Sequence, residues 1–375
     1  MVSIKEVSTK KELAQFIKLP FALYKGHKRW VPPLISDERR LLGADTNPSF
    51  SSGGCEAAYF LAHRGGKAVG RIAAIVNHRA NEKWKNKVAR FGWVDFVDDY
   101  EASGALLKAA EQWSKGKGMT GIQGPMGFTD FDLQGMLVEG FEHLPPIISP
   151  YNHPYYPQHL EKHGYGKEVD WLQYRLNASQ PIPEKIRRVN QHITQKYNLR
   201  TVIFKKRSDV MLYANKFFDA VNMAWGGMHG FVQFTPEQID YYAKAFFSFI
   251  RPELFCLVLD DKDDVVGFGL CLPTLSRAFQ KARGKLFPFG FIHILKSLYR
   301  YSEIDLYVNG VLPEWRNRGI HSLYYAAMNE IFIRRRIKVA ISSSQLETNI
   351  NALGIWDNYE KELLFRTRCY IKENL

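Results

Sequence analysis

The chain has 375 residues, of which 46% are apolar, and this is enough for two globular domains that each bury a core. Its 51 basic and 38 acidic residues give a net charge of +13, which favours an anionic partner such as a cofactor phosphate, an acidic carrier protein, a lipid surface or nucleic acid. The charge-free stretch 286–295 is about half of a membrane span, and no basic-then-apolar leader opens the chain, so we expect a cytoplasmic protein.

The first half of the sequence predicts strands and helices in mixed order. The dipeptide Gly65-Gly66 between two apolar runs predicts a hairpin with arms over residues 58–63 and 68–77. A helix over 100–115 is indicated by apolar residues at helical spacing. The other predicted elements are strands over 4–8, 92–97, 121–123 and 169–176, and helices over 11–24, 37–42 and 155–163.

The second half repeats this order of elements. Ser, Gln and two prolines interrupt the pattern at 177–183, which predicts domains of residues 1–178 and 179–375. The repeat consists of a strand, two helices, a hairpin, and then strand, helix, strand, helix and strand, over residues 199–204, 210–223, 236–250, 254–272, 304–311, 319–335, 339–343, 349–359 and 365–371. We therefore predict an α/β fold with mixed sheets and two repeated domains.

The junction after the strand over 304–311 carries a glycine and basic side chains at a helix start. Backbone N–H groups there, aided by the helix dipole, could cradle a pyrophosphate, although an ordinary basic helix start is the alternative. The run Val311-Leu312-Pro313-Glu314-Trp315-Arg316-Asn317-Arg318-Gly319-Ile320 resembles the acyl-coenzyme A loop of the GNAT acyltransferases. The family loop usually continues with a small residue where this chain has His321, which would crowd the phosphates or add a contact to them.

This resemblance implies two tandem GNAT-like domains and an acyl-CoA or acetyl-CoA co-substrate, or an acyl carrier protein in its place. It implies that the donor is bound by Val311, Arg316, Arg318, Gly319, Ile320, His321 and Asn349. The four cysteines form no paired motif and have no metal-type histidine spacing, so we expect buried thiols and no metal.

The strand before this loop carries a row of polar residues. Glu303, Asp305, Tyr307 and Asn309 alternate with apolar residues, which predicts that all four lie on one face. In a GNAT-like fold this strand is central, and a carboxylate on it often takes the proton of the attacking amine. We therefore predict Asp305 as the base, with Glu303 and Tyr307 as alternates. A half-exposed strand with ordinary polar residues is the competing interpretation.

The segment Asn349-x-x-Ala352-x-x-x-Trp356 resembles the last motif of the family, where an Asn begins a helix beside the thioester arm. A Tyr in the family frequently protonates the departing thiolate, and Trp356 occupies that position here. Tyr359, one turn further, is the candidate substitute, although a thiolate whose pKa is about 8.5 leaves with little help. Core packing is the alternative role of both aromatic residues.

The corresponding junction of the first half is acidic. Asp98, Asp99 and Glu101 stand where a pyrophosphate would bind, so we expect no coenzyme A in this half. The Gly- and Pro-rich segment 124–128 and the aromatic cluster 151–156 are predicted pocket walls, or alternatively loops that only pack.

Residues 277–300 contain six Lys or Arg, no acidic residue and an apolar string over 286–292. This pattern suits an interfacial segment on anionic lipid at the inner membrane face, or a basic loop over the core. The predicted function is acyl transfer to an amine, with a long-chain lipid amine as one acceptor. The alternatives are an aminoacyl-tRNA-dependent transferase and a non-catalytic binding protein. Because no nucleic-acid motif is present, nucleic acid ranks below a thioester as partner.

Overall fold

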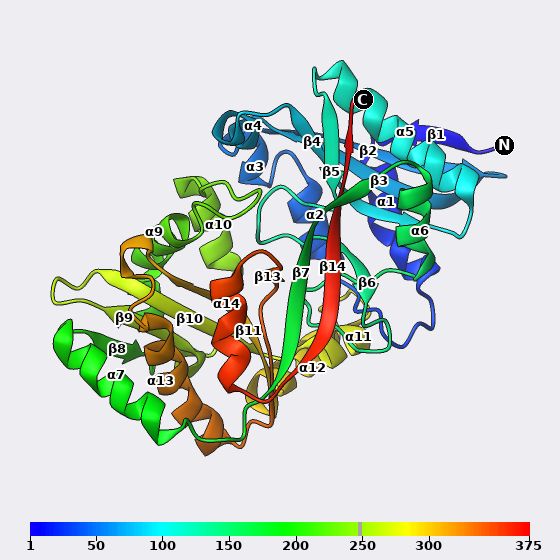
Figure 1. The fold of residues 1–375 in the computed structure, drawn as a ribbon. Coiled ribbons are helices and arrows are strands. Elements are labelled where there is room, and N and C mark those ends of the chain that lie inside the picture. Colours follow the sequence, from blue (N-terminus) through cyan, green and yellow to red (C-terminus); the bar gives the residue numbers. More distant parts are fainter. Residues whose placement is uncertain (247–249) are drawn as a thin grey trace.

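The computed structural model describes residues 1–246 and 250–375, and its strands form one long mixed sheet (Figure 1). The strands of the first half are β1 (Ser3–Glu6), β2 (Cys55–Arg64), β3 (Lys67–Asn77), β4 (Val88–Phe96), β5 (Gly121–Gly124), β6 (Met136–Glu139) and β7 (Gly166–Asn177). Those of the second half are β8 (Arg200–Ile203), β9 (Phe255–Leu259), β10 (Val265–Pro273), β11 (Glu303–Val311), β12 (Val339–Ile341), β13 (Gln345–Leu346) and β14 (Lys361–Glu373).

Helices cover this sheet in both halves. The first half has α1 (Lys10–Leu23), α2 (Ile35–Leu42), α3 (Pro48–Ser51), α4 (His78–Trp84), α5 (Tyr100–Gly116) and α6 (Tyr155–Lys162). The second has α7 (Glu184–Lys196), α8 (Arg207–Leu212), α9 (Ala214–Ala224), α10 (Pro236–Phe246), α11 (Ser276–Ala282), α12 (Gly290–Tyr299), α13 (Ile320–Arg335) and α14 (Ile350–Gly354), and the short 3-10 helices η1 (Pro252–Leu254), η2 (Pro313–Trp315) and η3 (Ile355–Asn358).

Most predicted elements are present, although several differ in extent, and the structure adds α3, α4, β6, α11, α12 and β13. The predicted helix over 210–223 is divided into α8 and α9. The end of the predicted helix over 236–250 falls on residues 247–249, which lie outside the described residues. The helix α7 was not predicted, although Ile186, Val189 and Ile193 recur in it at helical spacing.

The closing strand of each half pairs with the other half. Along the sheet the order is β1-β2-β3-β4-β5-β14-β7-β12-β11-β10-β9-β8, so β14 pairs with β5 of the first half and β7 pairs with β12 of the second. The two closing strands also pair with each other, and Figure 1 shows them side by side between the halves. The two halves therefore share one continuous sheet, and β7 ends one residue before the predicted boundary.

Each half has a core on both faces of its part of the sheet. In the second half, one core lies under α8, α9 and α10, and the other lies under α13. The four cysteines are buried and form no disulfide, as predicted. Among the described residues, no helix is long and apolar enough to cross a membrane.

Each half also contains one parallel pair of strands, β4–β5 in the first and β11–β12 in the second. The first strand of each pair has an irregular register with its antiparallel neighbour. In β11, Val308 pairs with Leu270 and Leu306 with Cys271, so the register with β10 shifts at Tyr307. In β4, Trp93 lies at the shift and has a positive φ of 45°. Such irregularities bend a strand and redirect its side chains.

Candidate active site

The predicted glycine turn is an open helix start. Gly319 is the N-cap of α13 with a φ of 76°, and no side chain caps this end. Asn317 also has a positive φ, of 60°. The backbone N–H groups of Asn317, Arg318 and Gly319 donate no hydrogen bond to any residue that the structure describes. Together with the helix dipole, these N–H groups are suited to an anion.

The side chains around this turn differ in their availability. Arg316 donates to the carbonyl oxygen of Ala224 at 2.6 Å, which ties it to the end of α9. The exposed Arg318 lies over the rings of Tyr197 and Trp315, with its guanidinium carbon 5.4 and 5.0 Å from their centroids. Arg318 is therefore the basic side chain of the turn that is not committed to a backbone carbonyl.

The other predicted binding residues are partly or fully covered. Ile320 is buried, and Val311 and His321 are half-buried. Burial lowers the pKa of His321, so its imidazole is neutral at pH 7 and adds no charge for a phosphate. A Cβ on Gly319 would lie 2.7 Å from Cδ1 of Ile193, so α7 packs directly against the turn. This close approach and the positive φ both require glycine.

The equivalent helix start of the first half is already occupied. The carboxylate of Asp99 caps α5, because its Oδ1 accepts from the backbone N–H groups of Glu101 and Ala102 at 3.0 and 3.2 Å. Arg64 pairs with Asp99 and Glu101 at 2.6 and 2.7 Å. The protein supplies its own anion at this end, which agrees with the expectation that this half binds no pyrophosphate.

The predicted row of four polar residues on β11 is divided by the irregularity at Tyr307. Tyr307 packs against the core under α9 and α10, whereas Ile304 and Leu306 belong to the core under α13. The side chain of Asn309 donates instead to Oγ of Ser343, beyond β12, at 3.0 Å. The prediction that Asn309 shares a face with Asp305 and Tyr307 was therefore wrong, because the register shift between β10 and β11 reverses the alternation.

Asp305 is buried, with 2% of its surface exposed, and its Oδ1 accepts from the hydroxyl of Thr274 at 2.8 Å. Burial raises the pKa of Asp305 to about 7, although the Thr274 hydrogen bond opposes this rise and the charge of Glu303 adds to it. Glu303 itself is exposed at the start of β11. A carboxyl group whose pKa is near 7 has the acidity that a general base requires.

The strands β11 and β12 separate beyond Asp305. They pair only over Glu303–Asp305 and Val339–Ile341, and the chain after β12 then pairs with β7 through β13. Among the described residues, no strand neighbours this edge of β11 beyond Asp305, although the carbonyl oxygen of Asn309 accepts from the indole N–H of Trp225 at 3.0 Å. This edge of β11 runs from Asp305 towards the glycine turn. The amide groups of a bound ligand could form hydrogen bonds with the backbone of β11 along this edge.

The last predicted motif is only partly associated with this site. Asn349 begins α14, as predicted, and its Oδ1 accepts from the N–H of Ala352 at 3.2 Å. Trp356 is buried, and its indole N–H donates to Oε1 of Gln345 at 2.9 Å, so it is a core residue. Tyr359 packs against Trp356 and the core under α13. The structure does not bring Tyr359 together with Asp305 and Tyr307, which face the opposite core.

A cavity of about 520 Å³ lies between the two irregular strands, with Trp93 of β4 and Tyr307 of β11 in its wall. Leu272, the β10 partner of Asp305, also lines it. Both predicted wall segments contribute, the first with Pro125, Met126 and Gly127 and the second with Tyr151, Asn152 and Tyr156. The rest of the wall is largely apolar and includes Val31, Pro32, Pro33, Leu34, Ile147, Leu275, Phe279 and Leu286.

Four carboxyl groups line this cavity, and so do the basic side chains of Arg40, Arg71 and Lys244. Asp95 pairs with Arg71 at 2.7 Å and Asp37 with Arg40 at 3.3 Å, whereas Glu38 and Asp132 form no ion pair with any described residue. Burial raises the pKa of Asp132 to about 7 and also raises the pKa of Glu38, which accepts from the indole N–H of Trp93 at 2.9 Å. Glu38 and Asp132 are therefore the two carboxyl groups of this cavity that are suited to a cationic or amine ligand.

Asp132 and Glu38 were not predicted from the sequence. Asp132 follows the Gly- and Pro-rich segment, and a Cβ on Gly127 would lie 2.3 Å from its Cβ, so this glycine makes room for it. The N–H of Thr129 donates to Oδ2 of Asp132 at 3.0 Å, and Phe131 stacks on Phe234 of the second half. In the sequence, the only indication of this site was an acidic residue that closely follows the glycine at 127. The direction of the Asp132 side chain depends on contacts between the halves, which the sequence does not show.

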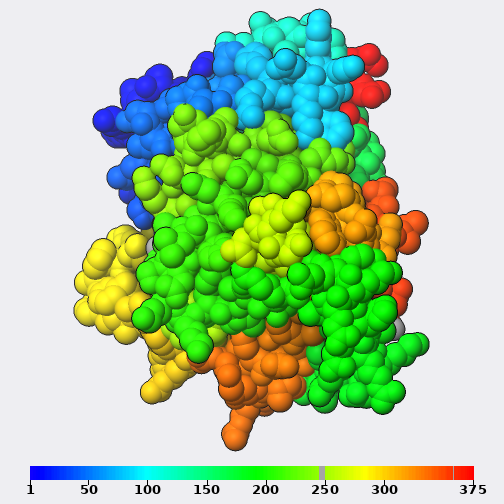
Figure 2. Space-filling view, turned by 90° about the vertical axis from the view of Figure 1, so that its left-hand side faces the viewer, coloured from blue at the N-terminus to red at the C-terminus, as the bar shows by residue number. Residues whose placement is uncertain are grey.

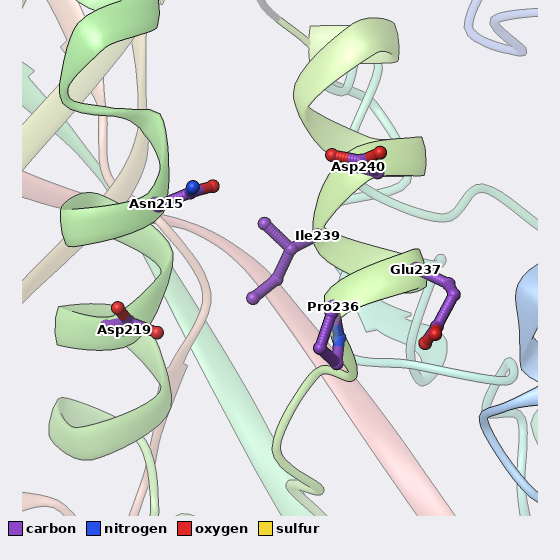
Figure 3. Close-up of a pocket in the computed structure, with 6 residues that line it drawn as sticks. All are labelled: Asn215, Asp219, Pro236, Glu237, Ile239 and Asp240. Carbon is purple, nitrogen blue, oxygen red and sulfur yellow. The ribbon is translucent and has the colours of Figure 1, made fainter.

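A second hollow of about 460 Å³ lies on the outside of α9 and α10 (Figure 3). Asn215 and Ile239 point into the gap between the helices, whereas Glu237 points away from α9. The carboxylates of this hollow therefore do not converge on one point. No residue of β11 or of the glycine turn lines the hollow. Within the described ranges, no group of three His, Cys, Asp or Glu is arranged to hold a metal ion.

Comparisons with known proteins place this geometry among GNAT folds. No protein-family model matches the chain. Protein YghO from Escherichia coli (strain K12) is 27% identical over 373 residues, which cover 97% of this chain and 93% of that protein. The bacterial ceramide synthase from Caulobacter vibrioides (strain NA1000 / CB15N) is 29% identical over 298 residues, which cover 78% of this chain and 76% of that protein.

The similar solved structures include a tandem GNAT protein from the clavulanic acid biosynthesis pathway. It is 12% identical, with a TM-score of 0.56, and the match covers 100% of this chain and 99% of that one. A GCN5-related N-acetyltransferase from Sphaerobacter thermophilus matches with a TM-score of 0.53 and 14% identity over 99% of this chain and 95% of that one. The predicted resemblance to the GNAT acyltransferases and the predicted tandem GNAT-like fold are both confirmed.

Proposed function

We propose that this protein, which has the tandem GNAT fold, is an N-acyltransferase that moves an acyl group from an acyl thioester to an amine. The observation that carries the proposal is the cavity between the halves, which adjoins β11 and holds two carboxyl groups that form no ion pair with a described residue. The ceramide synthase relative supports an N-acylation and, more finely, a long-chain lipid amine as acceptor.

The donor is proposed to bind along the second half. The open N–H groups before α13 and the exposed Arg318 would hold the pyrophosphate of an acyl-CoA. The edge of β11 that pairs with no described strand would accept the amide-containing arm, and the thioester would then lie near Tyr307 and the cavity. Val311, Ile320, His321 and Asn349 stay predicted contacts of this donor, and Arg316 would act by holding the turn against α9.

The chemistry requires a neutral amine. Its nitrogen attacks the thioester carbonyl carbon, a C–N bond forms, the C–S bond breaks and the thiol leaves as a thiolate. The proton of the amine goes to a carboxylate. Asp132, which faces the cavity, is our proposed base. Asp305 is the alternative that the sequence predicted, with Glu303 and Tyr307 as further candidates on β11.

The cavity wall supports a long-chain acceptor. Most of its lining consists of apolar and aromatic side chains, whereas Glu38 accepts from Trp93, and burial and the charge of Asp132 raise the pKa of Tyr307. A long-chain amine would place its alkyl chain on the apolar wall and its ammonium group near Asp132 and Glu38. A small polar amine would leave this apolar surface uncovered.

Thermal stabilisation and product analysis together test the proposal. We expect palmitoyl-CoA to raise the unfolding temperature more than acetyl-CoA does, and we expect Gly319→Glu to abolish the shift by placing a carboxylate at the anion site. Mass spectrometry should then detect an N-palmitoyl product from palmitoyl-CoA and hexadecylamine.

The matched control for Gly319→Glu is Gly118→Glu. Gly118 has a similar φ of 78° and open space around it, so this variant has the same backbone strain without a carboxylate at α13. If neither thioester stabilises the wild-type protein but palmitoyl acyl carrier protein supports turnover, the carrier is the donor. Salt-sensitive binding of aminoacyl-tRNA with no response to any thioester would contradict the proposal and favour the tRNA-dependent alternative.

A further inference from the structure

The insert between β10 and β11 exposes an unusual number of large apolar side chains. Phe287 is 74% exposed, Phe289 68% and Tyr299 64%. Ile292, Leu295 and Tyr299 are spaced by three and four residues on α12, so they share one helix face, and both Ile292 and Leu295 are also exposed. The opposite face, with Ile294 and Leu298, packs on Leu34 and Leu275. The exposed face is therefore not the face that anchors α12 to the protein.

The charged side chains of the insert are all of one sign. The six basic residues of the insert are exposed, namely Arg277, Lys281, Arg283, Lys285, Lys296 and Arg300, and the insert has no acidic residue. Gln280 of α11 donates to the carbonyl oxygen of Lys28 at 2.9 Å, which brings the loop after α1 alongside. Lys25, Lys28 and Arg29 of this loop are also exposed. In Figure 2 the insert, in yellow, projects from the left edge of the molecule.

This projecting surface is continuous with the wall of the cavity. Leu286, which directly precedes the exposed Phe287, lines the cavity together with Phe279 of α11. The neighbouring segment Trp30 to Leu34 lines it as well, and Gln280 donates to the carbonyl oxygen of Trp30 at 3.0 Å. The same two segments thus carry the basic surface on the outside and the apolar wall on the inside.

We propose that the insert α11–α12, with the loop after α1, docks on an anionic lipid bilayer. Phe287, Phe289 and the exposed face of α12 enter the boundary between headgroups and acyl chains, and the surrounding Lys and Arg side chains bind lipid phosphates. Exposed aromatic residues alone would suit a protein partner equally well. The ring of basic residues without an acidic member favours a bilayer, whose surface is anionic throughout.

The docked orientation has a consequence for the acceptor, and this consequence rests on the proposed function. A long-chain amine is held in the membrane by its alkyl chain. Because Leu286 and Phe279 connect the docked surface with the cavity, the amine could pass between them without its chain entering water. The membrane would then be the source of the acceptor, while the thioester donor reaches the glycine turn from solution.

Vesicle flotation tests the docking without requiring turnover. We expect the full chain to float with vesicles of phosphatidylcholine and phosphatidylglycerol, to float weakly with phosphatidylcholine alone, and to dissociate as salt is raised. The double variant Phe287→Ser/Phe289→Ser should lower partitioning by at least about tenfold, since two exposed aromatic rings would no longer transfer from water into the bilayer. Lys281→Glu/Lys285→Glu should remove the preference for anionic vesicles.

Two controls change similar residues elsewhere. Leu212→Ser removes an apolar side chain that is 82% exposed on α8, and Lys262→Glu reverses an exposed charge in the β9–β10 turn. Both should partition as the wild type does. Equal losses in the controls, or no flotation of the wild type, would overturn the docking. So would a dimer in light scattering that Phe287→Ser/Phe289→Ser dissociates, because a second copy would then cover the surface.

N-acylation of a detergent-dispersed amine without flotation would refute the docking alone, whereas flotation without acylation would refute the proposed function alone.

Discussion

At the scale of single residues, the most consequential group is Asp132. Its carboxyl faces the cavity, and burial raises its pKa to about 7. As a base it must be ionised, so kcat/KM for N-acylation should rise with pH up to about 7 and then level off. Asp132→Asn should lower kcat/KM by roughly a hundredfold or more and remove this dependence on pH.

The control for this variant comes from the same loop. Asp130 is also a carboxyl group whose pKa is raised by burial, but it does not line the cavity. Asp130→Asn should therefore keep the pH dependence of the wild type. An unchanged pH profile in Asp132→Asn, with a large loss in Asp305→Asn, would transfer the role of base to Asp305.

Asp305 gives a separate prediction about stability. Its pKa is about 7 in the folded chain and about 3.9 in an unfolded one, so the folded state binds one more proton between about pH 4 and pH 7. Stability therefore falls as the pH rises through this window, and the full cost, on the order of 2 to 4 kcal/mol, is present above pH 7. Asp305→Asn should raise the unfolding temperature at pH 8 by more than at pH 5.

Thr274 supplies the control for the Asp305 prediction. An Asn at position 305 can still accept the Thr274 hydrogen bond, so the variant removes the charge with little loss of contact. Thr274→Val removes the hydrogen bond but keeps the charge, and it should lower the unfolding temperature at both pH values. A gain in Asp305→Asn that is equal at pH 5 and pH 8 would show that ionisation is not its cause.

At the scale of elements, α5 and α13 are equivalent helices with opposite starts. Asp99 caps α5 with its own carboxylate, whereas α13 begins at an uncapped Gly319. We expect Asp99→Ala to lower the free energy of unfolding by about 1 kcal/mol in urea titrations, as the loss of a cap does elsewhere. The dissociation constant of palmitoyl-CoA should not change, because the donor is proposed to bind only at α13.

Asp99→Asn is the companion variant, since Asn is as good a cap as Asp but carries no charge. It should restore most of the lost stability. A weaker affinity for palmitoyl-CoA in either variant, by isothermal titration, would contradict the assignment of the donor to the second half.

The elements also show what the sequence could predict. The hairpin at Gly65-Gly66, the helix α5 and the strand β11 were predictable, because turn residues and apolar periodicity are local signals. The irregularity at Tyr307 was not predictable, because it depends on pairing with β10. Since the face of Asn309 depends on this irregularity, the prediction for Asn309 was wrong as well. In the candidate site, Asp305 and Tyr307 lie on the same face of β11, as the alternation predicted. Asp132 and Glu38 were found only in the structure, because segments distant in the sequence bring them to the cavity.

At the scale of the whole molecule, the exchange of β7 and β14 joins the two halves. Each closing strand pairs with the other half, so each half alone lacks one strand of its sheet. Further contacts cross between the halves, including Arg90 to the carbonyl oxygen of Gly230 at 2.8 Å and Thr129 with Tyr242 at 2.6 Å. The cavity exists only where the halves meet, which explains why a half without a donor site is still needed for the proposed acceptor site.

This exchange predicts how fragments of the protein behave. Residues 1–178 expressed alone would leave the edge of β5 unpaired and β7 projecting, and residues 179–375 would leave β14 without either neighbour. We expect neither fragment alone to unfold cooperatively in circular dichroism. Co-expressed fragments should copurify through a tag on one of them, because β7 and β14 complete each other's sheets, and the pair should recover the thermal response to palmitoyl-CoA. Cooperative unfolding of either fragment by itself would mean that this fragment folds without the strand exchange. The pairing of β7 and β14 with the other half would then not be required for either half to fold.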